Sequence, residues 1–223
     1  GKRPNGYVGF TYDLTPFLNE GHNTLVVKVD NSAQPNSRWY TGSGIYRNVW
    51  LEIKNPVSII KHGTYIVAEN ISSKSADIKI ETKIGNTLKN NKNIELVSEI
   101  YAANGHKVSE ASSKLEAKST DTAKIDHILS VENPKLWSPD SPAQYKLVSK
   151  VKKKKEIIDK YISHFGIRSI RFDAETGFWL NDKNIKIKGV NNHHDGGPVG
   201  AAVPDDVLHR RLKILKEMGC NAI

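Results

Sequence analysis

The chain has 223 residues, of which 38% are hydrophobic and 26% are charged, and 33 Lys and Arg against 24 Asp and Glu give a net charge of +9. This globular composition excludes a disordered chain, and no apolar run approaches the ~20 residues of a membrane-spanning helix. The single cysteine, Cys220, excludes an internal disulfide framework and a multi-cysteine metal cluster.

The first part of the chain alternates apolar and polar residues, which predicts half-buried strands at residues 25–30 and 49–53. Turn-forming residues at 19–23 and 42–44 bound these strands. We therefore expect residues 1–56 to be the closing strands of an antiparallel sandwich whose other strands lie upstream. The turn-like first residues and the strand-like residues 221–223 indicate an internal part of a longer protein.

The middle of the chain carries short β-rich runs separated by turns, and this spacing predicts an immunoglobulin-like β-sandwich. The runs are residues 58–69, 76–84, 94–101, 123–131, 145–151 and 157–164. In the second run isoleucines alternate with charged residues, so one face should meet a core and the other water. Trp137, flanked by prolines, is expected to close one end of this sandwich.

Four consecutive lysines, Lys152 to Lys155, form a charge run between two predicted strands. They could contact phosphates, but a lysine-rich hairpin tip also keeps the edge of a sheet soluble, and charge blocks are usually solvated. We favour the hairpin tip. No aromatic stacking platform is interleaved with the basic residues, so we expect no nucleic-acid partner despite the net charge.

After Phe165 the pattern becomes that of a β-loop-α unit. A strand-like run at residues 185–190 precedes a loop and a helix, which begins after Pro204 with two aspartates and ends at Gly219. Leucines and a methionine at residues 208, 212, 215 and 218 give the helix one apolar stripe. After a helical crossover, residues 221–223 should run parallel to residues 185–190.

The loop between that strand and that helix gathers amide, imidazole and carboxylate groups at the edge where parallel α/β folds place ligand sites. Its polar residues include Asn192, His193, His194 and Asp195. Three interpretations stay open: metal ligation, recognition of sugar hydroxyls, and a turn whose side chains satisfy backbone groups. Metal ligation is disfavoured, because adjacent histidines on a strand point to opposite sides and no third ligand recurs at a recognisable spacing.

Across nearly its whole length the chain resembles the family 2 glycoside hydrolases, the family of β-galactosidases, β-glucuronidases and β-mannosidases. The stretches GFTYDLTPFL at 9–18, GHNTL at 21–25 and WYTGSGIYRNV at 39–49 resemble the end of that family's N-terminal jelly-roll domain. PKLWSP at 134–139 resembles its sandwich domain. FGIR at 165–168, GFWLN at 177–181 and KGVNNHHD at 188–195 resemble the entry into its TIM barrel.

The resemblance implies a mainly β chain in three parts. These are the C-terminal part of a jelly-roll sugar-binding domain at 1–56, an immunoglobulin-like sandwich at 57–164, and the truncated start of a TIM-barrel catalytic domain, with its first βα unit, at 165–223. It further implies part of a retaining exo-β-glycosidase, β-galactosidase-like, that hydrolyses terminal β-glycosidic bonds of an oligosaccharide or β-glycoside.

Residue by residue, the resemblance implies that His193 and Asp195 line the −1 sugar subsite after the first barrel strand. His194 stands at a position that varies among the family's branches, and Asn192 replaces a basic residue found in some of them. Arg38 and Trp39 stand where the jelly-roll loop approaches the active site, although a surface arginine beside a core tryptophan fits the same pattern.

Retaining catalysis requires two carboxyl groups about 5 to 5.5 Å apart. No acidic residue after Phe165 matches the Asn-Glu acid/base motif of the family, so we expect both catalytic glutamates outside this sequence and no activity from the segment alone. We expect no cofactor within it, and a divalent or monovalent cation is compatible with the intact enzyme.

Other expectations concern partners and compartment. The resemblance is compatible with a homo-oligomer in the periplasm or cytoplasm of a bacterium, with no membrane partner. The alternative function is a noncatalytic carbohydrate-binding or adhesion module made of two β-sandwiches.

Overall fold

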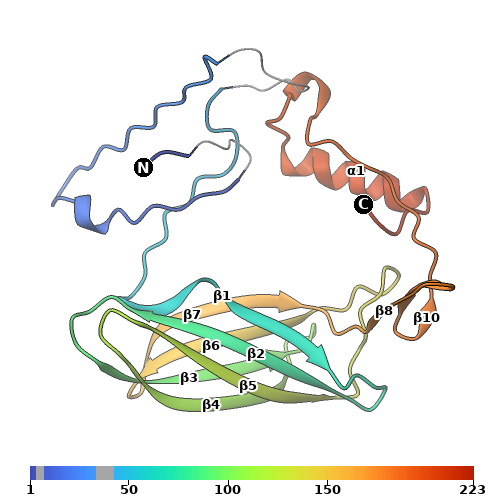
Figure 1. The fold of residues 1–223 in the computed structure, drawn as a ribbon, viewed down its shortest axis with the longest axis horizontal. Helices are drawn as coiled ribbons and strands as arrows, with labels where there is room; N and C mark the ends of the chain where they lie inside the picture. Colours follow the sequence, from blue (N-terminus) through green and yellow to red (C-terminus); the bar gives the residue numbers. More distant parts are fainter. Residues whose placement is uncertain (4–7, 34–42) are drawn as a thin grey trace. The chain divides into compact units, whose positions relative to one another are not determined.

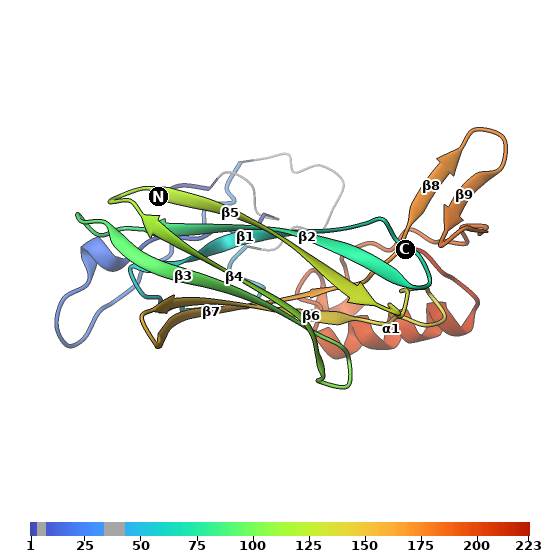
Figure 2. The same ribbon diagram turned by 90° about the horizontal axis from the view of Figure 1, so that it is seen from below.

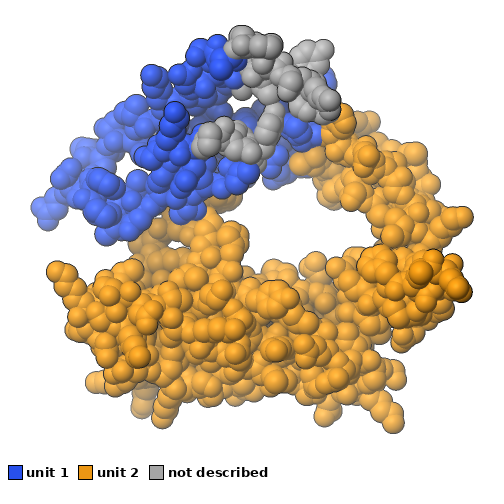
Figure 3. All heavy atoms as spheres, in the orientation of Figure 1, with its two compact units in different colours: residues 1–48, 194–207 blue, residues 49–193, 208–223 orange. Residues whose placement is uncertain are grey.

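The computed structural model describes residues 1–3, 8–33 and 43–223. The chain divides into two compact units, one of residues 1–48 with 194–207 and the other of residues 49–193 with 208–223 (Figure 3). Every strand of the described residues belongs to the second unit, and most of these strands form one β-sandwich (Figures 1 and 2).

The sandwich consists of seven antiparallel strands in two sheets, which confirms the predicted architecture. The strands are β1 (Val57–Glu69), β2 (Ser75–Asn86), β3 (Lys92–Tyr101), β4 (Lys107–Ala117), β5 (Thr122–Glu132), β6 (Tyr145–Lys153) and β7 (Glu156–Phe165). One sheet has the order β1-β2-β5 and the other β4-β3-β6-β7. Strand β4 is absent from the sequence prediction, because most of its residues are small or charged, and Val108 is its only β-branched or aromatic residue.

Alternating side chains of these strands fill the space between the two sheets with two apolar clusters. The first cluster contains Ala76, Ile78, Ile80, Ile100, Leu129, Val131, Tyr145, Leu147 and Ile167. The second contains Val57, Ile59, Ile84, Ile94, Leu96, Ala117 and Val151. The predicted alternation in β2 is confirmed, since its isoleucines are buried while Lys79 and Lys83 are exposed.

The described part of residues 1–56 forms no strand, so the predicted strand pairing at residues 25–30 and 49–53 is not observed. Its regular element is a single 3-10 turn, η1 (Thr15–Phe17). Val26 and Trp50 are 82% and 77% exposed. A strand forms only when its backbone groups find a partner strand, and alternation in sequence does not supply that partner. The jelly-roll assignment of this segment stays a prediction.

Beyond the sandwich, the chain forms a small antiparallel sheet of β8 (Ile170–Asp173), β9 (Gly177–Leu180) and β10 (Lys183–Asn184), in the order β10-β9-β8. A 3-10 turn, η2 (Gly197–Val199), and helix α1 (Asp205–Glu217) follow. The predicted helix is confirmed at both ends: two aspartates occupy its first turn, and Gly219 follows it with a φ of 90°.

The predicted hairpin tip is also confirmed. Lys153 pairs with Glu156 where β6 meets β7, and Lys154 turns the chain with a φ of 57°. The lysine run is therefore the solvated connection of two antiparallel strands. None of the described helices is long and apolar enough to span a bilayer.

Candidate functional site

The candidate site is built on the first parallel pairing of the βα unit. The prediction that residues 221–223 run parallel to residues 185–190 is confirmed by a bridge between Gly189 and Ala222, although the pairing is limited to this bridge and no longer strand forms. A Cβ atom on residue 189 would lie 3.3 Å from the carbonyl oxygen of Ala222. Glycine at this position therefore permits the close approach of the two backbones.

The side chain of Asn221 fixes this pairing, a role that sequence reasoning missed. Its Oδ1 accepts a hydrogen bond from the Lys188 amide at 2.8 Å, and its Nδ2 donates to the Lys186 carbonyl at 3.0 Å. The amides of Asn221 and Ala222 both donate to the Lys188 carbonyl, at 3.0 and 3.2 Å. An amide side chain just before a short strand is the only sequence signal for this role, and it also fits a simple turn.

Two hollows flank the parallel pair. One, of about 280 Å³, lies at its carboxyl edge and is lined by Gly189, Val190, Asn191, Ala222 and Ile223. The other, of about 590 Å³, lies on the amino side and includes Lys188, Lys216, Cys220 and residues 138–140 of the sandwich domain. In barrel folds the carboxyl edge holds ligands, whereas the amino side serves stability.

The predicted site residues Asn192, His193, His194 and Asp195 follow directly after Asn191 at the carboxyl edge. All four are exposed and lie in neither helix nor strand. Imidazole nitrogens donate or accept, a carboxylate accepts, and a primary amide does both, so the set can hydrogen-bond the hydroxyls of a sugar ring. The two other predicted residues, Arg38 and Trp39, lie outside the described residues.

A glycine-rich loop fixes the chain just after these residues. The Gly196 amide donates to the Gly200 carbonyl at 2.8 Å, and the Gly200 amide donates to Gly197 at 3.0 Å. A Cβ atom on residue 196 would come within 2.6 Å of Val199 and 3.1 Å of Val203. The closed loop thus fixes the backbone directly after Asp195.

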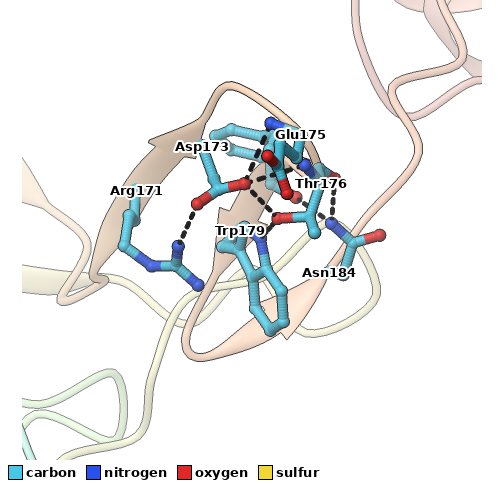
Figure 4. Close-up of polar contacts among 7 residues, drawn as sticks. Arg171, Asp173, Glu175, Thr176, Trp179 and Asn184 are labelled. Carbon is cyan, nitrogen blue, oxygen red and sulfur yellow. Dashed lines mark hydrogen bonds and ion pairs between the residues drawn. The ribbon is translucent and has the colours of Figure 1, made fainter.

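A dense group of polar contacts in the hairpin β8-β9 is a structural turn (Figure 4). Oδ1 of Asp173 accepts hydrogen bonds from the amides of Glu175 and Thr176, at 3.1 and 2.8 Å, and from the Thr176 hydroxyl at 2.7 Å. These hydrogen bonds hold the pKa of Asp173 below its usual value, and the bond from the Thr176 hydroxyl contributes most. Its Oδ2 lies 3.4 Å from Arg171.

The other acidic residues after Phe165 are distributed over the turns and the helix. Glu175 and Asp182 lie in turns of the small sheet, while Asp205, Asp206 and Glu217 belong to α1. Within the ranges that the structure describes, no three His, Cys, Asp or Glu side chains gather closely enough to hold a metal ion.

Comparison with protein families gives two adjacent matches. The family described as "Glycosyl hydrolases family 2" matches residues 60–168, and "Glycosyl hydrolases family 2, TIM barrel domain" matches residues 173–223. The first match covers nearly all of the sandwich. The second contains β9, β10, the polar segment, α1 and the parallel bridge, and it begins at the last residue of β8.

Similar proteins extend over the whole chain. A β-galactosidase of Bacteroides ovatus is 44% identical over 100% of this chain and 26% of its own length, and a β-glucuronidase of Formosa agariphila is 36% identical over 100% and 25%. The crystal structure of a β-glycosidase from Bacteroides vulgatus superposes with a TM-score of 0.83 at 41% identity, covering 100% of this chain and 28% of that one. The chain thus spans about a quarter of the length of these relatives.

Proposed function

Because this chain belongs to glycosyl hydrolases family 2, we propose that it is part of a retaining exo-β-glycosidase that hydrolyses terminal β-glycosidic bonds. One observation carries the proposal. The segment Asn192 to Asp195 leaves the carboxyl edge of a parallel βα unit inside the region matched by the family's TIM-barrel domain. That edge is where barrel enzymes bind their substrates.

In this proposal His193 and Asp195 form one wall of the −1 sugar subsite, with Asn192 and His194 beside them. Their hydrogen bonds to ring hydroxyls orient the sugar, and bonds that strengthen as the ring approaches its oxocarbenium-like transition state lower the barrier. The nucleophile and the acid/base are two glutamates in the part of the enzyme that this chain does not include. The segment therefore binds and orients substrate without performing the bond cleavage.

We propose a β-galactosidase-like specificity, which the 44% identity to a β-galactosidase supports. A β-glucuronidase at 36% identity makes a terminal glucuronide the competing substrate. The two sugars differ in the carboxylate of the glucuronide and in the orientation of a hydroxyl group. Parallel assays of the full-length protein with aryl β-galactoside and aryl β-glucuronide, compared by kcat/KM, distinguish them.

The proposed role is tested in the full-length protein. Asp195→Ala is expected to lower kcat/KM for the preferred aryl β-glycoside on the order of 10²-fold or more, because contacts made in the transition state are lost. Asp206→Asn in the first turn of α1 is the matched control and should keep the activity. His193→Ala should likewise lower kcat/KM. His209→Ala changes an exposed histidine of α1, serves as its control and should keep the activity.

Two results would contradict the proposal. Unchanged kinetics of Asp195→Ala would remove this carboxylate from the sugar site. A full-length protein that binds glycans but turns over no aryl β-glycoside would instead be the noncatalytic carbohydrate-binding or adhesion module.

Further properties of the intact enzyme belong to the same proposal. They are a bound divalent or monovalent cation outside this segment, assembly as a homo-oligomer, and location in the periplasm or cytoplasm of a bacterium. Both curated relatives described above are bacterial. Metal analysis and light scattering of the purified full-length protein test the first two.

A further inference from the structure

A layer of polar side chains crosses the middle of the sandwich core. It contains Thr82 of β2, Ser98 of β3, His127 of β5 and Ser149 of β6, all with exposures of 6% or less. In three of these strands, the inward-facing residues two positions before and two positions after the polar residue belong to different apolar clusters. Thr82 lies between Ile80 and Ile84, Ser98 between Leu96 and Ile100, and Ser149 between Leu147 and Val151. The layer therefore separates the two clusters.

His127 connects the two sheets within this layer. Its Nδ1 lies 2.9 Å from the hydroxyl of Ser98, and its Nε2 lies 2.9 Å from the hydroxyl of Ser113. His127 belongs to β5 in the sheet β1-β2-β5, whereas Ser98 and Ser113 belong to β3 and β4 in the sheet β4-β3-β6-β7. Burial lowers the pKa of His127, so the ring is neutral at pH 7 and donates one of these bonds while it accepts the other.

Three further hydroxyl groups of the core have no hydrogen-bond partner among the described residues. They are Oγ1 of Thr64, Oγ1 of Thr82 and Oγ of Ser149. Thr64 stands directly opposite Thr82 in the β1-β2 ladder, and Ser149 stands opposite Ser98 in the β3-β6 ladder. Two of the unpartnered hydroxyls, those of Thr82 and Ser149, thus belong to the layer itself, and that of Thr64 lies beside it.

Small side chains stand next to each other at the same level, since Ser98 is opposite Ser149 in the β3-β6 ladder. Serines occupy inward positions of β3 and β6 that are flanked by leucine, isoleucine and valine. A buried polar group without a partner costs stability, so native cores pair such groups or hydrate them. A buried water typically makes about three hydrogen bonds to otherwise unsatisfied polar groups.

We propose that this layer is an internal hydration site, in which ordered water links the hydroxyls of Thr82 and Thr64 on one sheet to that of Ser149 on the other. Together with the direct bonds of His127, this water fixes how the two sheets align. The site is independent of the sugar subsite and lies entirely within the sandwich.

The test replaces the hydroxyls by groups of similar shape and follows amide hydrogen exchange of β2 and β6 in the full-length protein. Thr82→Val and Ser149→Ala should each lower the protection of these amides by roughly 2- to 12-fold, the loss expected for one buried hydrogen bond. The double variant should lose less than the product of the two single losses, because both remove the same water. Thr122→Val, at an exposed position of β5, is the control and should keep full protection.

Unchanged or increased protection in Thr82→Val and Ser149→Ala would overturn the proposal, because apolar replacement of truly unpaired hydroxyls is neutral or stabilising. A crystal structure of the unmodified protein gives a readout that does not depend on how the variants fold. Ordered water within hydrogen-bond distance of Thr82 and Ser149 is expected, and a dry layer would contradict the inference.

Discussion

The guanidinium carbon of Arg168 lies 4.6 Å from the centroid of the Trp137 ring. The same tryptophan donates a backbone hydrogen bond to the Ile167 carbonyl at 2.8 Å, and its own carbonyl accepts one from Nδ2 of Asn181 at 3.0 Å. Three sequence stretches that are distant along the chain, 134–139, 165–168 and 177–181, therefore meet at the end of the sandwich. Trp137 lies where the chain passes from the sandwich to the small sheet, in agreement with its predicted place.

Gly166 lets the chain pass beside this tryptophan. A Cβ atom on residue 166 would lie 2.9 Å from the Cβ of Trp137, closer than packed carbon atoms tolerate. Gly166→Ala should therefore lower the free energy of unfolding by about 1 to 3 kcal/mol, the usual cost of overpacking, as measured by urea unfolding. In Gly9→Ala the new methyl meets nothing within 4 Å, and this variant should unfold like the parent. Equal stability of the two variants would disprove the packing argument.

His127 makes the stability of the sandwich depend on pH. Burial lowers the pKa of its folded-state imidazole below about 6.5, the unfolded value, although the nearby Asp126 carboxylate opposes this shift. As pH falls through the pKa of His127 in the unfolded chain, the unfolded chain binds a proton at this residue and the folded protein does not. The free energy of unfolding therefore decreases, and it levels off below the pKa of the folded state. His127→Gln should flatten this part of the stability-pH curve from urea unfolding. A curve that keeps the slope of the parent between pH 7 and 5 would assign the effect to other groups.

Asn221 should control the exchange of one particular amide. In Asn221→Ala the Lys188 amide loses the Oδ1 acceptor that lies 2.8 Å away, so its hydrogen exchange should accelerate. Asn221→Asp keeps this acceptor and loses the donor to the Lys186 carbonyl. The Lys188 amide should therefore exchange more slowly in this variant than in the alanine variant. Each lost bond should cost about 0.5 to 1.5 kcal/mol. Identical exchange of Lys188 in both variants would show that the side chain is dispensable.

Lys154 offers a stabilising substitution. Its φ of 57° is a backbone conformation that glycine adopts more readily than lysine. Lys154→Gly should raise the free energy of unfolding by about 0.5 to 1 kcal/mol. The left-handed conformation costs lysine roughly 1 to 2 kcal/mol, and this outweighs the roughly 0.5 to 1 kcal/mol by which the entropy of glycine favours the unfolded chain. If the lysine run is only a hairpin tip, the variant should also keep the proposed glycosidase activity of the full-length protein. A loss of activity together with weaker, salt-dependent substrate binding would give the run a functional role.

The sequence alone predicted those elements whose side chains carry the signal for the element or for its ends. Isoleucine alternation identified β2, and Pro204, the two aspartates and Gly219 bounded α1. The parallel approach of residues 189 and 222 follows from the handedness and length of a helical crossover. Residues 192–195 could be proposed as a binding segment because amide, imidazole and carboxylate groups can bind a polar ligand, and this role stays a prediction.

Only the tertiary structure decided which segments pair as β-strands. Residues 25–30 and 49–53 have the alternation of strands, yet they form no ladder in the described structure, whereas the polar strand β4 does, because β3 supplies its partner. The roles of Asn221 and His127 likewise depend on groups that are distant in sequence. A sequence pattern reports which face of a segment is apolar, but a hydrogen bond requires a second backbone or side chain, and only the folded chain brings it within reach.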